Sequence, residues 1–228
     1  MNIANRSIGL ISLCYLGGAL LWATGVLAEN GGLDDKLLGQ IEQVYGADGR
    51  ARVVRWDELV HAPQGATTME KLERVNRFFN KLRFVSDRTH WGQEDYWATP
   101  IEFLASNAGD CEDFVVAKYF TLKEMGVPIE RMNLTYDKAL KLNQAHMVLT
   151  YFETPDAEPL VLDNLINVIR PASLRKDILP VYSFNGDNLW LAKKRGRGQL
   201  VGKSSQLSSW TELIGRMAGN GMRKARAQ

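Results

Sequence analysis

A thiol and three carboxylates lie together in one short segment, Asp110-Cys111-Glu112-Asp113. The apolar residues that follow predict a helix that starts at Asp110 and runs to about Met125. Unpaired backbone N–H groups and the helix dipole at such a terminus favour a thiolate, and the same groups can bind an oxyanion. Cys111 is therefore a candidate nucleophile. The alternative is a small, inert residue packed in the core.

A thiol nucleophile needs a base within hydrogen-bond reach and a group that orients this base. His146 lies in an alternating run that predicts a strand, whereas His61 and His90 lie in irregular segments. Asp163 follows three apolar residues at the end of the next β-rich run. If these two strands pair, Cys111, His146 and Asp163 have the order of a Cys/His/Asp triad. Taken alone, Asp163 could instead cap a turn.

The carboxylates beside Cys111 oppose its ionisation, because nearby negative charge raises the pKa of a thiol. As residues at a helix N-terminus they need no other explanation, since acids are favourable there. A bound cation would remove the conflict. Asp110, Glu112 and Asp113 offer the oxygen ligands that Ca²⁺ prefers, and Asn107 with loop carbonyls could complete the shell. The sequence therefore predicts a calcium site at the turn that presents the thiol.

The first 28 residues have the layout of a secretory signal peptide. Arg6 lies in a polar start, an apolar run extends from Ile8 to Trp22, and a small residue, Ala28, stands at the expected cut. A retained membrane anchor is the alternative. Cleavage would remove Cys14 and leave Cys111 as the one cysteine of the mature chain, so an intramolecular disulfide is excluded.

The remaining residues, 29–228, suffice for a single domain with a substantial core. The net charge of +2 gives no indication of nucleic acid as the main partner. Basic residues collect in a C-terminal tail at about 193–228, which we interpret as a solvated segment.

Periodicity predicts an α+β fold with helices packed on an antiparallel sheet. Helices are expected within 30–63 as one or two short pieces, at 67–82, at 101–104, at 110–125 and after a cap formed by Ser209 and Glu212. Strands are expected at 134–137, 145–152, 160–165, 181–184 and 189–191, with a hairpin turn at 153–158 and an ordered loop at 90–100.

Four segments of the chain resemble the bacterial transglutaminase-like cysteine proteinases, the LapG-like family of periplasmic proteases. These segments are Asp95 to Pro100, Gly109 to Asp113, His146 to Leu149 and Leu162 to Leu165. The resemblance implies a papain/transglutaminase-like core with the nucleophile helix packed on an antiparallel sheet. It also implies that Cys111 is the nucleophile, His146 the base and Asp163 its orienter, with calcium ligands at Asp110, Glu112 and Asp113.

The same resemblance implies a calcium-dependent endoprotease that cuts the N-terminal region of a large surface adhesin at a paired-alanine sequence and so disperses biofilm. An inner-membrane cyclic di-GMP receptor of the LapD type would control it, and no membrane anchor would remain after signal cleavage. A cell-wall amidase or a transglutaminase of the same fold group is one alternative. A non-catalytic calcium-binding interaction module is the other.

Overall fold

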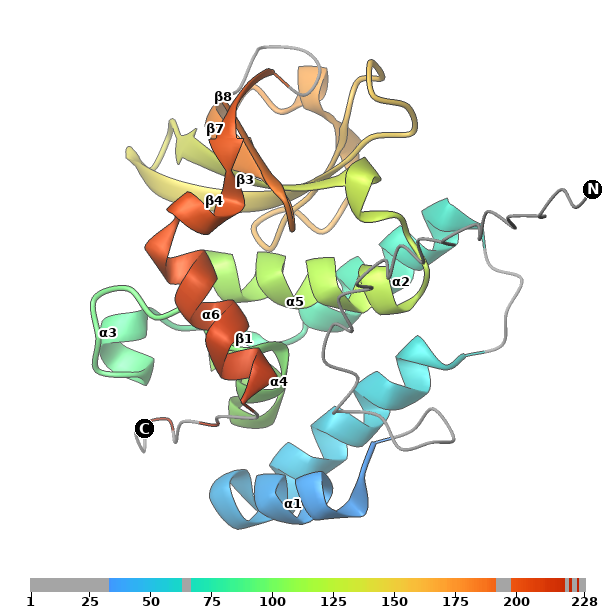
Figure 1. Ribbon diagram of the computed structural model, residues 1–228, viewed down its shortest axis with the longest axis vertical. Coiled ribbons are helices and arrows are strands. Elements are labelled where there is room, and N and C mark those ends of the chain that lie inside the picture. The colour runs from blue at the N-terminus through green and yellow to red at the C-terminus, as the bar shows by residue number, and fades with distance from the viewer. Residues whose placement is uncertain (1–32, 63–66, 192–197, 220–221, 223–224, 226–228) are drawn as a thin grey trace, which may run out of the picture.

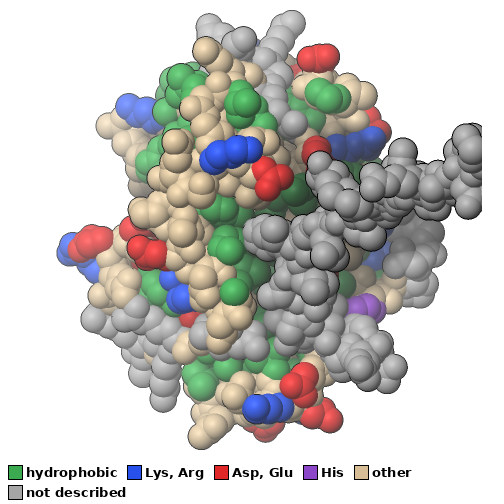
Figure 2. All heavy atoms as spheres, viewed as in Figure 1, with side chains coloured by type: hydrophobic (Ala, Val, Ile, Leu, Met, Phe, Trp, Pro, Cys, Tyr) green, Lys and Arg blue, Asp and Glu red, His purple; other side chains and the backbone are tan. Residues whose placement is uncertain are grey.

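The computed structural model describes residues 33–62, 67–191, 198–219, 222 and 225. The expected signal peptide, residues 1–28, lies outside the described residues. The expected solvated tail is described in part, and this part forms a strand and a helix. Figure 2 shows acidic and basic side chains in small separate groups over the face in view, in keeping with the near-balanced net charge of +2.

The helices gather on one side of the sheet, with α1 at the end of the molecule farthest from it (Figure 1). The α-helices are α1 (Asp35–Val60), α2 (Thr68–Phe79), α3 (Asp87–His90), α4 (Pro100–Ser106), α5 (Cys111–Glu124) and α6 (Ser208–Ala218). Short 3-10 turns are η1 (Ile129–Arg131), η2 (Ala172–Leu174) and η3 (Ser204–Gln206). Among the described residues, no helix combines the length and the apolar character needed to cross a membrane.

Local sequence signals account for several helix boundaries. The expected capping box of α2 is present: Thr67 Oγ1 accepts from the Glu70 amide at 3.3 Å, and Glu70 accepts from the Thr67 amide at 2.6 Å. Within α1, Gly46 has a φ of 75°, a conformation that glycine adopts at little cost, and joins two helical stretches. The expected one or two short helices are therefore one kinked element.

The main sheet has seven strands in the order β6-β5-β4-β3-β7-β8-β9, and every neighbouring pair is antiparallel. Its strands are β3 (Met132–Ala139), β4 (Gln144–Tyr151), β5 (Leu160–Leu162), β6 (Arg170–Pro171), β7 (Ile178–Phe184), β8 (Asn188–Leu191) and β9 (Gln199–Lys203). A parallel pair, β1 (Arg83–Phe84) with β2 (Ala108–Gly109), lies apart from it. The α+β prediction is confirmed. All expected strands are present, whereas β6, β9 and the parallel pair were not foreseen.

The core lies between α5 and the centre of the sheet. Ten of the 14 residues of α5 are buried, including Val116 and Leu122, and the facing strands contribute Leu134 of β3 and Leu149 of β4. A helix that is buried on most sides cannot shift without opening the core. The N-terminus of α5 is therefore held rigidly against the sheet.

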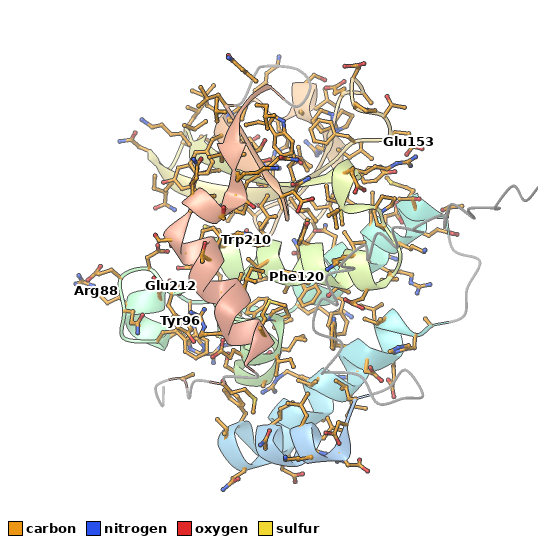
Figure 3. The ribbon with its side chains drawn as sticks, in the orientation of Figure 1. Arg88, Tyr96, Phe120, Glu153, Trp210 and Glu212 are labelled. Carbon is orange, nitrogen blue, oxygen red and sulfur yellow. The ribbon has the colours of Figure 1, made fainter. Side chains whose placement is uncertain are left out.

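Helix α6 crosses α5 through an aromatic cluster (Figure 3). Trp210 of α6 stacks on Phe120 of α5 at 5.7 Å between ring centroids and meets Phe184 of β7 edge-on at 5.3 Å. The helix therefore packs on the core, but the expected cap is wrong. Its N-cap is Leu207, because the Ser209 hydroxyl bonds Asp95 at 3.2 Å instead of a helical amide.

Replacing Trp210 by alanine should lower the free energy of unfolding by about 3 kcal/mol, because the change removes a buried ring that packs on three others. Urea denaturation followed by circular dichroism measures this loss. Met69→Ala is the control, since Met69 is 41% exposed and its truncation should change stability by less than about 0.5 kcal/mol. Equal effects of the two substitutions would contradict the role of α6 as part of the core.

Candidate active site

Cys111 is the first residue of α5 and lines a cleft of about 380 Å³. His146 lines the same cleft, together with the aromatic side chains of Trp97, Tyr136 and Tyr182. The structure therefore brings the predicted nucleophile and the predicted base to one cavity. The backbone N–H groups of the first turn of α5 have no helical partners and can serve an oxyanion there.

Gly109 allows the close approach that shapes the turn before Cys111. A Cβ atom at this position would lie 2.2 Å from Oδ2 of Asp113 and 2.8 Å from a ring carbon of Phe103. No side chain larger than hydrogen fits without moving these neighbours. The glycine in the segment is thus a requirement of the turn that presents the thiol.

The pairing of β4 with β5 brings His146 and Asp163 together as predicted. Leu149 lies opposite Leu162 in the register, so Asp163 directly follows the paired segment. Nε2 of His146 and Oδ1 of Asp163 are 2.9 Å apart, and both residues are buried. Because an ionised carboxylate only accepts, Nε2 carries the hydrogen and Nδ1 is the basic nitrogen of the neutral ring.

Asp163 is held in its ionised form by its hydrogen-bond donors. Burial acts to raise its pKa, but His146, the Leu165 amide and Arg175 outweigh it and lower the pKa to about 2. Arg175 contributes through Nη2, which lies 2.5 Å from Oδ2 of Asp163. Sequence reasoning missed Arg175, because a lone arginine in a loop carries no signal of its spatial neighbours.

A group of carboxylates surrounds the turn that carries the thiol. Asp110, Glu112 and Asp113 come from the predicted segment, and Asp87 of α3 joins them from outside it. Oxygens of Asp87, Asp110 and Asp113 lie within 4.8 Å of one another, as do those of Asp87, Asp95 and Glu112. Asp87 and Asp95 were not predicted as site residues.

The crowding of these acids makes their ionisation unfavourable. Burial first, and then neighbouring carboxylates, raise the pKa of Asp110 to about 9 and that of Asp87 to about 7. Burial also raises the pKa of Glu112 to about 7. Burial, followed by the charges of Glu112 and Asp110, raises the pKa of the Cys111 thiol, which donates to Glu112 Oε2 at 3.1 Å. The charge conflict expected from the sequence is therefore present in the structure.

The donor set suits a hard cation. Oδ1 of Asp87 and Oδ1 of Asp110 are buried, and neither has a hydrogen-bond partner among the described residues. Buried polar atoms without partners are costly, and carboxylate oxygens are the ligands that Ca²⁺ prefers. Both oxygens of Asp113 already accept backbone amides, from Ala98 at 2.7 Å and from Asp110 at 3.2 Å.

Asn107, the weaker of the predicted calcium ligands, lies at the C-terminal end of α4. It ends α4 in the left-handed conformation with a φ of 62°, and its carbonyl oxygen accepts from the Arg83 amide at 3.2 Å. These backbone contacts explain an asparagine at this position, since asparagine tolerates that conformation. Its role as a metal ligand stays a prediction.

With a chelator present, stability should fall by about 2 kcal/mol or more between pH 5 and pH 9. A carboxyl group with a raised folded pKa stabilises the fold fully below its unfolded pKa, near 4, and loses this contribution as the pH rises through the folded value. The loss of stability is therefore complete near pH 7 for Asp87 and Glu112 and near pH 9 for Asp110.

Urea denaturation at several pH values in this range measures the fall. Asp110→Asn should flatten the dependence, whereas Asp156→Asn, which alters an exposed residue in the β4–β5 turn, should leave it unchanged. A stability that does not vary over this range would contradict the coupling between the buried acids.

Comparison with known proteins places this geometry in a family. The family model of the bacterial transglutaminase-like cysteine proteinases matches residues 53–176. A search of curated proteins gives no match. Among solved structures, LapG of Legionella pneumophila is similar at 43% identity over 80% of this chain and 96% of that chain, with a TM-score of 0.70.

Two further structures of the Legionella pneumophila protein are also similar. The EGTA-treated form has a TM-score of 0.71, and the calcium-bound form has a TM-score of 0.68 and is covered over 98% of its length. Both share 43% identity with this chain. The family model spans more than half of the sequence, and the fold agrees over most of the described residues. The chain belongs to the bacterial transglutaminase-like cysteine proteinases.

Proposed function

We propose that this cysteine endopeptidase acts through Cys111, His146 and Asp163 and depends on calcium. One observation carries the proposal: the 2.9 Å hydrogen bond between His146 Nε2 and Asp163 Oδ1, in a histidine that shares its cleft with Cys111. Membership of a cysteine proteinase family favours this function over an amidase, a transglutaminase or a non-catalytic module.

The geometry supports acyl transfer through a thioester. Nδ1 of His146 takes the proton of the Cys111 thiol, and the sulfur attacks the scissile carbonyl carbon. The ionised Asp163 stabilises the imidazolium that forms, while amides of the first turn of α5 bind the oxyanion. The imidazolium then protonates the leaving amine. A water molecule, deprotonated by the same histidine, hydrolyses the acyl-enzyme and restores the thiol.

The calcium ion would be held by Asp87, Asp110, Glu112 and Asp113. When bound, it supplies positive charge that offsets these acids and lowers the electrostatic cost of forming a thiolate beside them. The unpartnered oxygens of Asp87 and Asp110 support this assignment, as does the calcium-bound structure of the similar Legionella protein. Asn107 remains a candidate for the outer part of the shell.

The substrate, the compartment and the control are inferred from the family. We take the substrate to be the N-terminal region of a large surface adhesin, cut at a paired-alanine sequence, so that cleavage releases the adhesin and disperses biofilm. The signal-like residues 1–28 support a periplasmic location. Sequestration by an inner-membrane cyclic di-GMP receptor of the LapD type would link proteolysis to that messenger.

Cys111→Ser and His146→Ala should each reduce cleavage of an adhesin N-terminal fragment by at least about 10³-fold, because they remove the nucleophile and the base. Asp163→Asn should be similarly impaired, since an amide cannot stabilise the imidazolium. Gel electrophoresis and mass spectrometry of the products measure the rate. Asp156→Asn and Asp187→Asn alter exposed residues and should leave it unchanged. Wild-type turnover in any triad variant would refute the assignment.

Removal of calcium with EGTA should stop cleavage, and Ca²⁺ should restore it better than Mg²⁺. Ca²⁺ accepts the irregular geometry of a bent loop, whereas Mg²⁺ demands a compact octahedron. Asp110→Ala and Glu112→Ala should lose both calcium binding, measured by calorimetry, and activity. Asp35→Ala, on the exposed start of α1, is the matched control and should keep both. Full activity in excess EGTA together with absence of calorimetric binding would remove the metal from the mechanism.

A further inference from the structure

Arg175 is a buried arginine whose guanidinium bonds two carboxylates at once. It is 4% exposed and lies between β6 and β7, just after the η2 turn. Its Nη2 donates to Asp163 Oδ2 at 2.5 Å and to Asp177 Oδ2 at 2.8 Å, and its Nε donates to Asp177 Oδ1 at 2.9 Å. Asp177 thus fixes the plane of the guanidinium, and the guanidinium in turn contacts the triad carboxylate.

The two oxygens of Asp163 have separate partners. Oδ1 accepts from His146 Nε2 and from the Leu165 amide at 3.0 Å, whereas Oδ2 accepts from Arg175. A carboxylate whose second oxygen is fixed cannot rotate about its χ2 bond without losing that contact. Arg175 therefore determines the orientation in which Oδ1 faces the imidazole.

Arg175 also offsets a local excess of negative charge. Asp137 lies directly opposite His146 in the β3–β4 register and is 1% exposed. Burial first, and then the charge of Asp163, raise the pKa of Asp137 to about 8, while Arg175 lowers it. Lys118 of α5 also interacts with the charge of Asp163; it is fully buried, and its Nζ has no hydrogen-bond partner among the described residues. Without Arg175, burial and Asp137 would both disfavour the ionised form of Asp163.

We propose that Arg175 is a positioning residue of the active site, which holds Asp163 oriented and ionised so that His146 can receive the proton of Cys111. This inference rests on the proposed triad. Arg175 lies outside the set of described residues that line the cleft. It therefore acts through Asp163, and its loss should affect turnover and not the binding of substrate.

The test compares Arg175→Met and Arg175→Lys with Arg170→Met, which alters an exposed arginine on β6. Cleavage of a peptide with a paired-alanine sequence is measured in Ca²⁺ for kcat and KM. We expect kcat of Arg175→Met to fall by about 10- to 100-fold, by analogy with the loss found when the groups that orient metal-ligating histidines are removed. KM should stay within a factor of about two, because the cleft is unchanged.

The pH dependence separates positioning from general structural support. The rate of Cys111 alkylation by iodoacetamide is followed from pH 4 to pH 9, a measurement that needs no substrate. On the acid side of this profile, the midpoint is the pH at which the alkylation rate is half of its maximum. Because Arg175→Met lacks the cation beside Asp163, its midpoint should be higher by about one pH unit. Arg175→Lys should restore the midpoint but only part of kcat, because lysine keeps the charge and cannot bridge both carboxylates. Arg170→Met should match the wild type.

A wild-type kcat and midpoint in Arg175→Met would overturn the inference, and so would a uniform loss of rate at every pH. If circular dichroism shows that Arg175→Met is unfolded, Asp177→Asn decides. Asp177 is 32% exposed in its side chain, so this variant is expected to fold. It should lower kcat by a smaller factor than the one expected for Arg175→Met at an unchanged KM, because the guanidinium loses the partner that fixes its plane, and a wild-type kcat would overturn the inference.

Asp163→Asn distinguishes this inference from the proposed function. An active Asp163→Asn enzyme would refute the triad itself, whatever Arg175 does. An inactive Asp163→Asn enzyme with a normal Arg175→Met variant would refute only the role of Arg175. In the Asp163→Asn background, Arg175→Met should reduce the alkylation rate by less than about twofold further, since residues that act as a unit are not additive.

Discussion

The repulsion among carboxylates at the start of α5 is the constraint on which the site depends. Asp87, Asp110 and Glu112 lie close enough to raise one another's pKa, and the thiol of Cys111 lies among them. A helix N-terminus ordinarily promotes a thiolate, but here burial and the adjacent acids oppose it. The thiol consequently donates to Glu112. The fold thus holds the proposed nucleophile where its ionisation depends on compensation of the surrounding charge.

The far side of the imidazole presents the opposite electrostatic situation. There Asp163 is buried yet keeps a pKa of about 2, because donors from three directions favour its charge. Burial lowers the pKa of the nearby Lys118 to about 7, so Arg175, which remains charged at any ordinary pH, is the dependable cation. The chain therefore supplies permanent compensation to the group that orients His146. At the thiol, by contrast, the described residues leave the negative charge uncompensated. A cation that binds reversibly beside the thiol, together with the fixed arginine beside Asp163, would make the formation of the thiolate the step that can be controlled. The orientation of the histidine would not change.

The sequence predicted the parts of the site that depend on short-range signals. The capping box at Thr67, the helix that opens at Cys111 and the alternating strand with His146 all follow from local spacing, and the pairing that places Asp163 follows from two adjacent strands. Asp87 and Arg175 could not be found in this way. Asp87 reaches the site from the short helix α3, 23 residues before Asp110, and Arg175 from the segment after η2, 12 residues beyond Asp163. No periodicity records which of these segments meet in space. The cap expected at Ser209 failed for the related reason that a tertiary partner, Asp95, competes for the hydroxyl.

The segment between α3 and α4 connects the charge cluster to the substrate cleft. Its Ala98 amide donates to Asp113, and its Asp95 accepts from Trp97 Nε1 at 3.0 Å and from Ser209 of α6. Arg216 of α6 contacts the same segment. It donates to the Trp97 carbonyl oxygen and lies over the ring of Tyr96. Asp95 and Trp97 line the cleft, and Asp95 also belongs to a carboxylate set with Glu112. A cation that ordered these carboxylates would therefore order the cleft wall as well. Compensation of charge at the thiol and ordering of the cleft wall would then be two results of one event.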